Sequence, residues 1–236
     1  MSRTIDVPGY EDYVKLGLDD TFAFHCTQCG KCCIEREDIM LNPLDLFKAS
    51  KELGISLREF REKYCEAYIG RNSLLPIIRL LPTGNKRRCP LLKNGRCMIH
   101  NAKPTMCAMY PLGRFVEMER DKDQIPIMSK NVNYLYKDPE CGDKSEVHTV
   151  REWLSSFNIK ENDEFYLLWT KMQADNVQFS KYLYTINPFA VNEFGVISGD
   201  IIYFNYEQDK DFMPQFKSNL DLISIFKEKI EMNIKK

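Results

Sequence analysis

Four cysteines lie within eight residues in the stretch Cys26-Thr27-Gln28-Cys29-Gly30-Lys31-Cys32-Cys33, and this stretch constrains the rest of the chain. Two thiols separated by two residues can bind one metal ion, because the residues between them turn the backbone and bring both sulfurs to one side. The spacing occurs twice, around Gly30, where a tight turn favours positive φ. Cys32 and Cys33 are adjacent, so we expect their side chains to point apart, toward different metals or different atoms of one cluster.

A disulfide framework, or a set of buried core thiols, is the alternative interpretation of this octet. Thiols so crowded in sequence cannot bridge one another without strain, which favours metal ligation. The motif does not by itself distinguish one metal from another. His25, directly before the octet, is expected to orient a neighbour by hydrogen bonding, with metal binding as the alternative.

The length and charge of the chain exclude several classes of protein. Its 236 residues are 44% hydrophobic and 28% charged, which is typical of one soluble domain or a compact domain with a second lobe. The formal net charge of -1 predicts neither nucleic-acid nor membrane binding. Residues 1–10 lack the apolar core of a secretory signal, and no stretch is suited to crossing a bilayer. Nine cysteines in a chain for which no export signal is expected indicate a reducing compartment and metal ligation, so we expect a cytoplasmic protein.

Charge is distributed unevenly along the chain. Residues 67–116 hold nine Lys or Arg and no Asp or Glu, whereas the flanking regions are acidic. Metal-bound thiolates carry excess negative charge, and nearby cations would offset it. A site for an anionic ligand or acidic peptide is the rival explanation, and a solvated basic surface is the third.

Further cysteines follow in and after this basic segment. Asn94-Gly95 favours a tight hairpin turn that would bring Cys89 and Cys97 together as a ligand pair. Cys65 has no cysteine nearby in sequence and is interpreted as a structural thiol. The eight predicted metal ligands are therefore Cys26, Cys29, Cys32, Cys33, Cys89, Cys97, Cys107 and Cys141. They could form two zinc sites, two cubane iron–sulfur clusters, one of each, or one cluster with the remaining thiols structural.

Periodicity predicts an α+β fold, mainly helical with few short strands around a loop-rich metal core. After an extended lead-in over residues 1–25, with residues 22–25 alternating, short strands are expected at 39–41 and 74–81. Helices are expected to start at Asn42-Pro43 and at Ser56, the second running through Cys65 to Tyr68. Later helices are predicted over 145–157, 161–173, 177–183 and 219–233, with a strand around 197–206. The predicted domains are a cysteine-cluster domain, residues 1–142, and a helical extension packed on it, residues 143–236.

With these motifs in view, the sequence resembles the YkgJ family of cysteine-cluster proteins, the CxxCxxCC group of zinc- or iron-chelating domains. The resemblance covers residues 22–156 and rests on the octet, Cys89-Pro90, Gly95-x-Cys97-x-Ile99-His100, Lys103-Pro104-x-x-Cys107 and Pro111. The eight cysteines match the family motif. An Arg often follows the fourth cysteine and the cysteine before the Pro; Ile34 and Ala108 stand there in this chain, so no role of those arginines is carried over.

The family includes flagellin lysine N-methylases, which are associated with a four-iron cluster and S-adenosylmethionine. The resemblance therefore implies an iron–sulfur cluster (4Fe-4S) as the preferred cofactor, with zinc as the alternative and S-adenosylmethionine as a further ligand. The chain has no glycine-rich nucleotide loop and no Cys-x-x-x-Cys-x-x-Cys radical motif.

Three functions are compatible with these observations. The first is an iron–sulfur enzyme of the methylase type that acts on a protein or peptide, with an open iron and with His100 and Tyr110 as the nearest polar candidates. For His100 a hydrogen bond to a metal ligand is the favoured alternative. The second is a zinc-stabilised binding module without turnover. The third is metal storage or delivery, which fits poorly with the apolar residues around the thiols.

Overall fold

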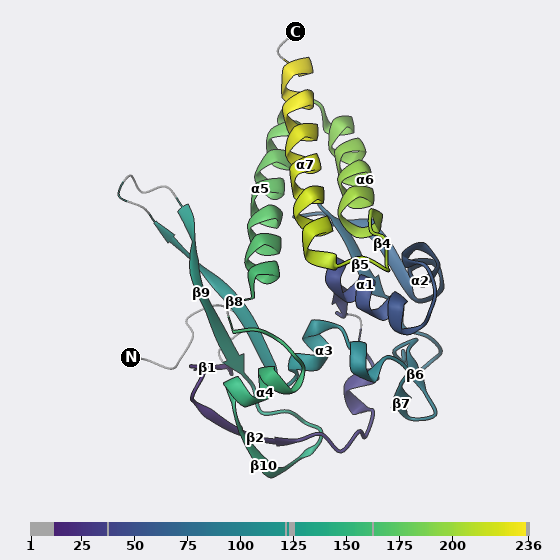
Figure 1. The fold of residues 1–236 in the computed structure, drawn as a ribbon, viewed down its shortest axis with the longest axis vertical. Coiled ribbons are helices and arrows are strands. Elements are labelled where there is room, and N and C mark those ends of the chain that lie inside the picture. Colours follow the sequence, from purple (N-terminus) through teal and green to yellow (C-terminus); the bar gives the residue numbers. More distant parts are fainter. Residues whose placement is uncertain (1–11, 37, 121, 123–125, 162, 235–236) are drawn as a thin grey trace. The chain divides into compact units, whose positions relative to one another are not determined.

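The computed structural model describes residues 12–36, 38–120, 122, 126–161 and 163–234 (Figure 1). The part of the expected N-terminal lead-in before residue 12 lies outside these residues. The chain divides into two compact units, each assembled from segments distant in sequence. Unit 1 comprises Met1–Ile34, Asn94–Arg96 and Thr105–Thr170, and unit 2 comprises Glu35–Lys93, Cys97–Pro104 and Lys171–Lys236. The domain division expected at residue 142 stays a prediction.

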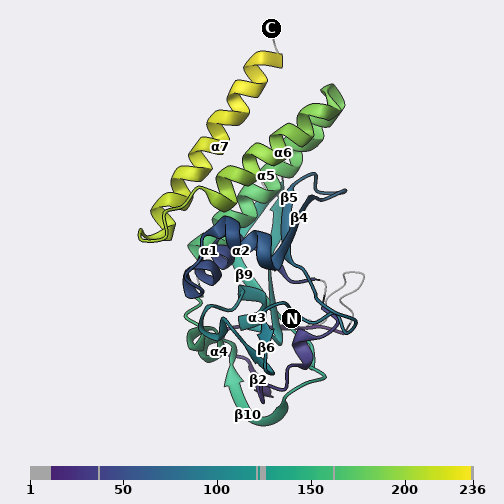
Figure 2. The same ribbon diagram turned by 90° about the vertical axis from the view of Figure 1, so that its right-hand side faces the viewer.

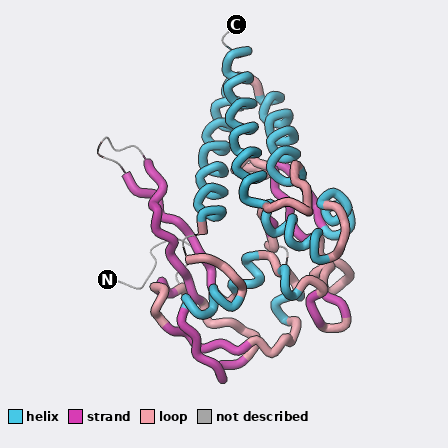
Figure 3. The backbone as a smooth tube through the Cα atoms, viewed as in Figure 1, coloured by secondary structure: helices cyan, strands magenta, loops and turns pink. Residues whose placement is uncertain are grey.

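Unit 1 contains two small antiparallel sheets. In one, β9 (Pro126–Tyr136) lies between β1 (Val14–Leu16) and β8 (Leu112–Arg120); in the other, β2 (Thr21–His25) pairs with β10 (Asp143–Thr149). The β8–β9 hairpin is drawn in Figure 3 as two long magenta strands. Two short helices, α3 (Thr105–Met109) and α4 (Val150–Ser156), belong to the same unit, and α5 (Glu164–Ile186) begins in it.

Aromatic side chains of β2 build the core of unit 1. Alternation along this strand buries Phe22 and Phe24, as expected for a strand with one covered face. Both rings meet Trp153 of α4 edge-on, with centroids 5.8 and 5.6 Å away. The indole Nε1 of Trp153 donates to the carbonyl of Met109 at 3.0 Å. This packing fixes α3 and α4 against the strand that leads into the cysteine octet.

Unit 2 combines a three-stranded sheet with long helices. In the sheet, β5 (Pro76–Leu80) lies between β3 (Met40–Leu41) and β4 (Cys65–Ile69) and is antiparallel to both. The helices are α1 (Pro43–Glu52), α2 (Leu57–Tyr64), most of α5, α6 (Pro188–Phe204) and α7 (Phe212–Ile234). Two further short strands, β6 (Leu92–Lys93) and β7 (Arg96–Cys97), form a hairpin whose segment Asn94–Arg96 is grouped with unit 1.

The long helices of unit 2 share an apolar core. Helices α6 and α7 are seen from a second side in Figure 2. Phe179 and Leu183 of α5 form a buried cluster with Phe194 of α6, and Phe226 of α7 packs against it. The rings of Phe194 and Phe226 are stacked with centroids 5.9 Å apart. No helix in the described part of the chain is long and apolar enough to cross a membrane.

The α+β fold class is confirmed, and local signals explain several elements. Asn42 caps α1 by accepting a hydrogen bond from the backbone of Asp45 at 2.8 Å, with Pro43 at the first helical position. Ser56 caps α2 by accepting from the backbone of Glu59 at 3.1 Å. The strands expected near residues 39–41 and 74–81 are β3 and β5.

The strand expected around residues 197–206 is wrong, because α6 extends through this region to Phe204. The run Ile201-Ile202-Tyr203-Phe204 has high β propensity, which tertiary packing overrides here. Asn187 caps α6 by accepting from the backbone of Phe189 at 3.1 Å. The helix can then bury one side at helical spacing against the rest of unit 2.

Four further expectations need correction. The second helix ends at Tyr64, so Cys65 begins strand β4 instead of lying in a helix. The helix expected over residues 145–157 starts only at Val150, because the preceding residues pair with β2 as strand β10. The two helices expected over residues 161–173 and 177–183 form one continuous helix, α5. The β8–β9 hairpin was not expected at all, since its strands mix polar and apolar residues without clear alternation.

Candidate metal centre

The pairing of β2 with β10 brings the cysteine octet to Cys141. Asp143 lies opposite His25 in this ladder, and a bulge separates that pair from the regular register of Val147 with Ala23. Cys26 directly follows His25, and Cys141 precedes Asp143 by two residues. Segments 115 residues apart in sequence, from Cys26 to Cys141, are therefore joined at one end of the same ribbon.

The octet folds as a turn followed by a short 3-10 helix, Lys31–Cys33. Gly30 has φ 71°, the positive value predicted for the position between the cysteine pairs. The backbone N–H of Cys33 donates to the Gly30 carbonyl at 3.0 Å. Because the chain is helical here and not extended, the Sγ atoms of Cys32 and Cys33 lie 3.9 Å apart. The expectation that these two side chains point apart is wrong.

Three thiols of unit 1 influence one another electrostatically. The pKa of Cys29 is lowered, mainly by a hydrogen bond with the backbone of Lys31 and further by one with the backbone of Gly142. Burial raises the pKa of Cys141, and the negative charges of Cys32 and Cys29 raise it further. The charges of Cys29 and Cys32 therefore act on Cys141, although the two cysteines lie more than a hundred residues before it in the sequence.

Polar groups surround these thiols. The Cys141 Sγ and the Tyr110 hydroxyl are 3.6 Å apart, and this hydrogen bond lowers the pKa of Cys141. The His25 Nδ1 lies 3.3 Å from the Asp143 carboxylate, and its Nε2 lies 3.7 Å from Glu146. His25 therefore has the orienting hydrogen bond expected for it. The two carboxylates were not identified from the sequence, although Asp143 follows Cys141 closely enough to have signalled a polar neighbour.

The remaining predicted ligands are distributed over both units. Cys107 lies half-buried on α3 of unit 1. In unit 2, Cys89 is buried and Cys97 is half-buried on β7, after the expected tight turn in which Asn94 and Gly95 have φ 50° and 76°. The proposed pairing of these two thiols stays a prediction.

Cys65 acquires a spatial neighbour that its sequence position did not suggest. Its pKa is raised to about 12, mainly by burial, with the positive charge of Arg61 opposing this shift and the charge of Cys89 adding to it. Cys65 is therefore a neutral buried thiol near Cys89. Its assignment as a structural thiol stays a prediction.

The basic segment is used in part for ordinary ion pairs. Arg79 on β5 pairs with Glu66 on the adjacent strand β4. Arg114 pairs with Asp163 at 2.8 Å, and its guanidinium lies 3.7 Å from the ring centroid of Tyr166. The expectation that the cations of this segment offset thiolate charge therefore does not apply to these two arginines, because carboxylates from outside the segment already neutralise them.

Of the two polar candidates, only Tyr110 has a described contact with a predicted ligand. His100 lies exposed in unit 2, in the 3-10 helix His100–Ala102. Partial burial, with a contribution from the positive charge of Lys103, lowers its pKa. Across the described residues, no three His, Cys, Asp or Glu side chains already converge in a geometry that would hold a metal ion. No disulfide links any of the nine cysteines, all of which are described.

A family model named CxxCxxCC, with the description "Putative zinc- or iron-chelating domain", matches residues 25–142, which is half of the chain. The chain belongs to the CxxCxxCC family. The matched range contains all eight predicted ligands of this CxxCxxCC protein. It begins at His25 and ends at Gly142, next to the β2–β10 pair described above. No curated protein and no solved structure matches the chain at a significant level.

Proposed function

We propose that this chain is a metal-cluster protein in which Cys26, Cys29, Cys32, Cys33, Cys89, Cys97, Cys107 and Cys141 bind iron–sulfur clusters. The carrying observation is the pairing of β2 with β10, with Asp143 opposite His25, because it joins the segment that enters the octet to the segment that follows Cys141. A metal bound by octet cysteines together with Cys141 would link the two ends of the region that matches the family, residues 25–142. Metal binding would therefore contribute directly to the stability of unit 1.

The donor set fits a soft metal. Thiolates are the ligands preferred by zinc and by iron–sulfur clusters, and they must be deprotonated to bind. Cys29 is suited to this condition, since hydrogen bonds with the backbone of Lys31 and Gly142 lower its pKa. Tyr110 provides a hydroxyl that can stabilise Cys141 in the same way. A bound cluster would supply either redox chemistry or an open iron for a substrate.

The catalytic form of this proposal is an S-adenosylmethionine-dependent modification of a protein or peptide. Its support is the resemblance to the YkgJ family, which includes flagellin lysine N-methylases. Thiolate ligands must remain reduced, so the proposal places the protein in a reducing compartment, the cytoplasm.

Zinc is the second candidate, favoured by one specific distance. The Cys32 and Cys33 sulfurs lie 3.9 Å apart. Zn–S bonds of about 2.3 Å in a tetrahedron place neighbouring sulfurs about 3.8 Å apart. Adjacent cysteines that share one ion in this way would form a zinc-stabilised binding module without turnover.

The deciding experiment is an anaerobic purification with iron, zinc and acid-labile sulfide counted per chain. Near-equal iron and sulfide with a brown colour would support the iron–sulfur form, and binding of S-adenosylmethionine would then be measured. About two zinc ions per chain without sulfide would support the binding module. Protein that retains neither metal after reconstitution would overturn both.

A matched pair of variants tests the assignment of ligands. Cys29→Ser removes an exposed thiol at the centre of the octet and should release metal. Cys65→Ser changes a buried thiol outside the proposed set and should leave the metal content unchanged. Unaltered metal content in Cys29→Ser would sink the assignment.

A further inference from the structure

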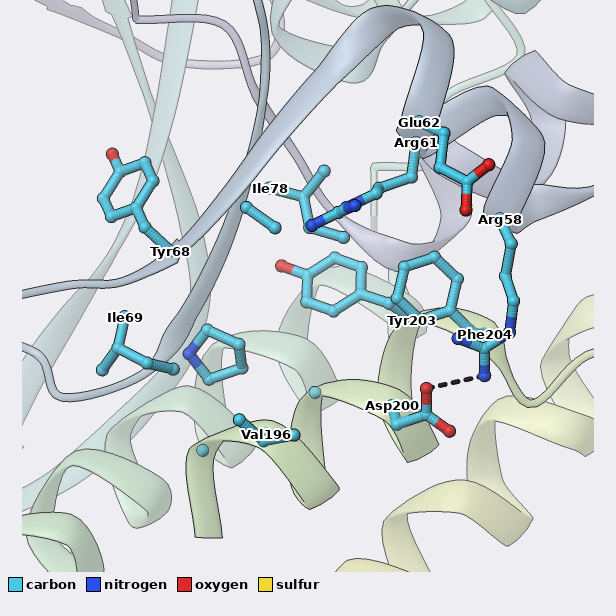
Figure 4. A pocket seen from close by; sticks show the side chains of 14 residues that line it. Arg58, Arg61, Glu62, Tyr68, Ile69, Ile78, Val196, Asp200, Tyr203 and Phe204 are labelled. Atoms are coloured by element: carbon cyan, nitrogen blue, oxygen red, sulfur yellow. Dashed lines mark hydrogen bonds and ion pairs between the residues drawn. The ribbon is translucent and has the colours of Figure 1, made fainter. Parts of the chain in front are cut away.

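Unit 2 contains a pocket with a volume of about 420 Å³, a size suited to a small ligand (Figure 4). Its wall is formed by α2, by strands β4 and β5, and by α6. None of its lining residues is a cysteine, so it is separate from the proposed metal ligands. No role in metal chelation accounts for it.

Two glycines of α6 set the shape of this pocket. A Cβ on Gly195 would lie 2.8 Å from Cδ1 of Ile69, and one on Gly199 would lie 3.0 Å from Cβ of Pro76. Without a Cβ at these positions, the helix can pack directly against the side chains of Ile69 and Pro76, which are paired across β4 and β5. Two positions further along the ladder, Ala67 is paired with Ile78, and both residues line the pocket. The small Ala67 side chain leaves the space open.

The apolar part of the pocket is extensive. Ile69, Pro76 and Ile78 come from the sheet, and Val196 and Phe204 come from α6. Val196 is 59% exposed, so most of its apolar surface is open to a ligand. A ligand with an apolar body would cover this surface and gain hydrophobic free energy.

The two arginines of the pocket differ in their partners. Arg58 is already engaged: it donates to Asp200 at 2.6 Å, and its guanidinium lies 4.8 Å from the ring centroid of Phe204. Arg61 is half-buried and forms no ion pair with any described carboxylate. Figure 4 shows its side chain extending from α2 toward Ile78 and Tyr203.

The remaining acidic residue does not neutralise Arg61. Glu62 is exposed, and Figure 4 shows its carboxylate leaving α2 on the side opposite to the Arg61 guanidinium. The inner part of the pocket therefore combines one available guanidinium with an apolar wall. A half-buried guanidinium in such surroundings is best satisfied by a carboxylate, which it can bind with two parallel hydrogen bonds.

We propose that this pocket binds a small monocarboxylate with an apolar body, either aromatic or branched aliphatic. The carboxylate pairs with Arg61, and the apolar body lies against Ile69, Ile78 and Val196. Arg58 and Asp200 form the fixed rim. An amine of the same shape should bind more weakly, because no unpaired carboxylate faces the pocket interior. A neutral amide should also bind more weakly, because it cannot form an ion pair with Arg61.

The test uses 4-phenylbutyrate and 4-methylpentanoate as probes and their primary amides as matched neutral controls. Binding to the full-length, metal-loaded protein is measured by titration calorimetry. We expect each acid to bind about tenfold or more tightly than its amide. Val196→Trp fills the pocket from an exposed position and should abolish binding of all four compounds.

Arg61→Gln should remove the preference for the acids, whereas Arg61→Lys should retain part of it. The control is Lys63→Gln, which removes a cation from the same helix that is already paired with Glu59. Thermal unfolding of each variant checks that it is folded. Equal binding of acid and amide, an unchanged preference in Arg61→Gln, or no binding of either acid at millimolar concentration would each overturn the proposal.

Discussion

His25 on β2 and Asp143 on β10 are directly opposite each other, with the His25 Nδ1 3.3 Å from the Asp143 carboxylate. This pair is the last one in the β2–β10 ladder: His25 directly precedes Cys26, and Asp143 directly follows Cys141 and Gly142. The position of Cys141 therefore depends on a tight backbone approach at Gly142. The first prediction tests that dependence.

Gly142 has φ 72°, and a Cβ there would lie 2.5 Å from the His25 carbonyl oxygen and 2.7 Å from the Phe24 ring. Gly142→Ala should therefore displace Cys141 and lower the metal content of the purified protein. Gly54 has a similar φ of 64° but nothing within 4 Å of an added Cβ, so Gly54→Ala is the matched control. Backbone strain should cost the control about 1 kcal/mol of unfolding free energy. The additional clash should cost Gly142→Ala roughly 2 kcal/mol more. Equal losses in urea unfolding would contradict this account.

The cap of α4 predicts a dependence of stability on acid pH. Glu152 accepts hydrogen bonds from the backbone and hydroxyl of Thr149 at 2.8 and 2.9 Å, and these lower its pKa from 4.5. A carboxyl group whose pKa is lower in the folded than in the unfolded state stabilises the folded protein at pH values above its unfolded pKa. This contribution is lost as the pH falls through the folded pKa. At pH 7 the unaltered protein should therefore have a larger free energy of unfolding than Glu152→Gln. This difference should disappear at pH values below the usual glutamate pKa of 4.5.

The control for this prediction is Glu193→Gln, which changes an exposed carboxylate on α6 that has no ion pair with the described residues. Its stability difference from the unaltered protein should not follow the same acid transition. Chemical unfolding at several pH values between 3 and 7 provides the measurement. A Glu152→Gln difference that stays constant with pH would rule the explanation out.

Arg114 and Asp163 form a largely buried ion pair. Removing one partner leaves the charge of the other without compensation. Their side chains are 7% and 18% exposed. Arg114→Met leaves the carboxylate without its partner and should cost about 3 kcal/mol of unfolding free energy. The double variant Arg114→Met, Asp163→Asn should recover part of this loss. Lys63→Met, which breaks an exposed pair with Glu59, should cost less than about 0.5 kcal/mol. A double variant as unstable as the sum of its single variants would contradict the coupling.

Elements with complete local signals could be predicted from the sequence. Asn42-Pro43 and Ser56 specify helix starts within a few residues, and the alternation of Phe22 and Phe24 specifies a strand. The Asn94-Gly95 turn likewise needs only its own two residues. In each case the hydrogen bonds or buried faces involve near neighbours in the chain.

Elements set by distant partners could not be predicted in this way. Residues 145–149 are predicted from the sequence to be part of a helix, and only the ladder with β2 makes them a strand. The run ending at Phe204 reads as a strand, and only packing within unit 2 makes it helical. The same limit applies to the site: spacing identifies Cys29 and Cys32 as ligands, but their closeness to Cys141 and that of Cys65 to Cys89 depend on tertiary structure.

Tyr110 provides the last prediction, because its hydroxyl lies 3.6 Å from the Cys141 sulfur. Burial raises the pKa of Cys141, and the hydrogen bond with Tyr110 opposes that effect by stabilising the thiolate. Tyr110→Phe should therefore raise the pKa of Cys141 and slow its alkylation by iodoacetamide in metal-free protein roughly threefold near pH 7.5. Peptide-resolved mass spectrometry measures this rate at Cys141 separately from the other thiols. Tyr68→Phe, which changes a hydroxyl in unit 2, is the control and should leave the rate unchanged. If Tyr110→Phe leaves it unchanged as well, the hydroxyl does not stabilise the Cys141 thiolate.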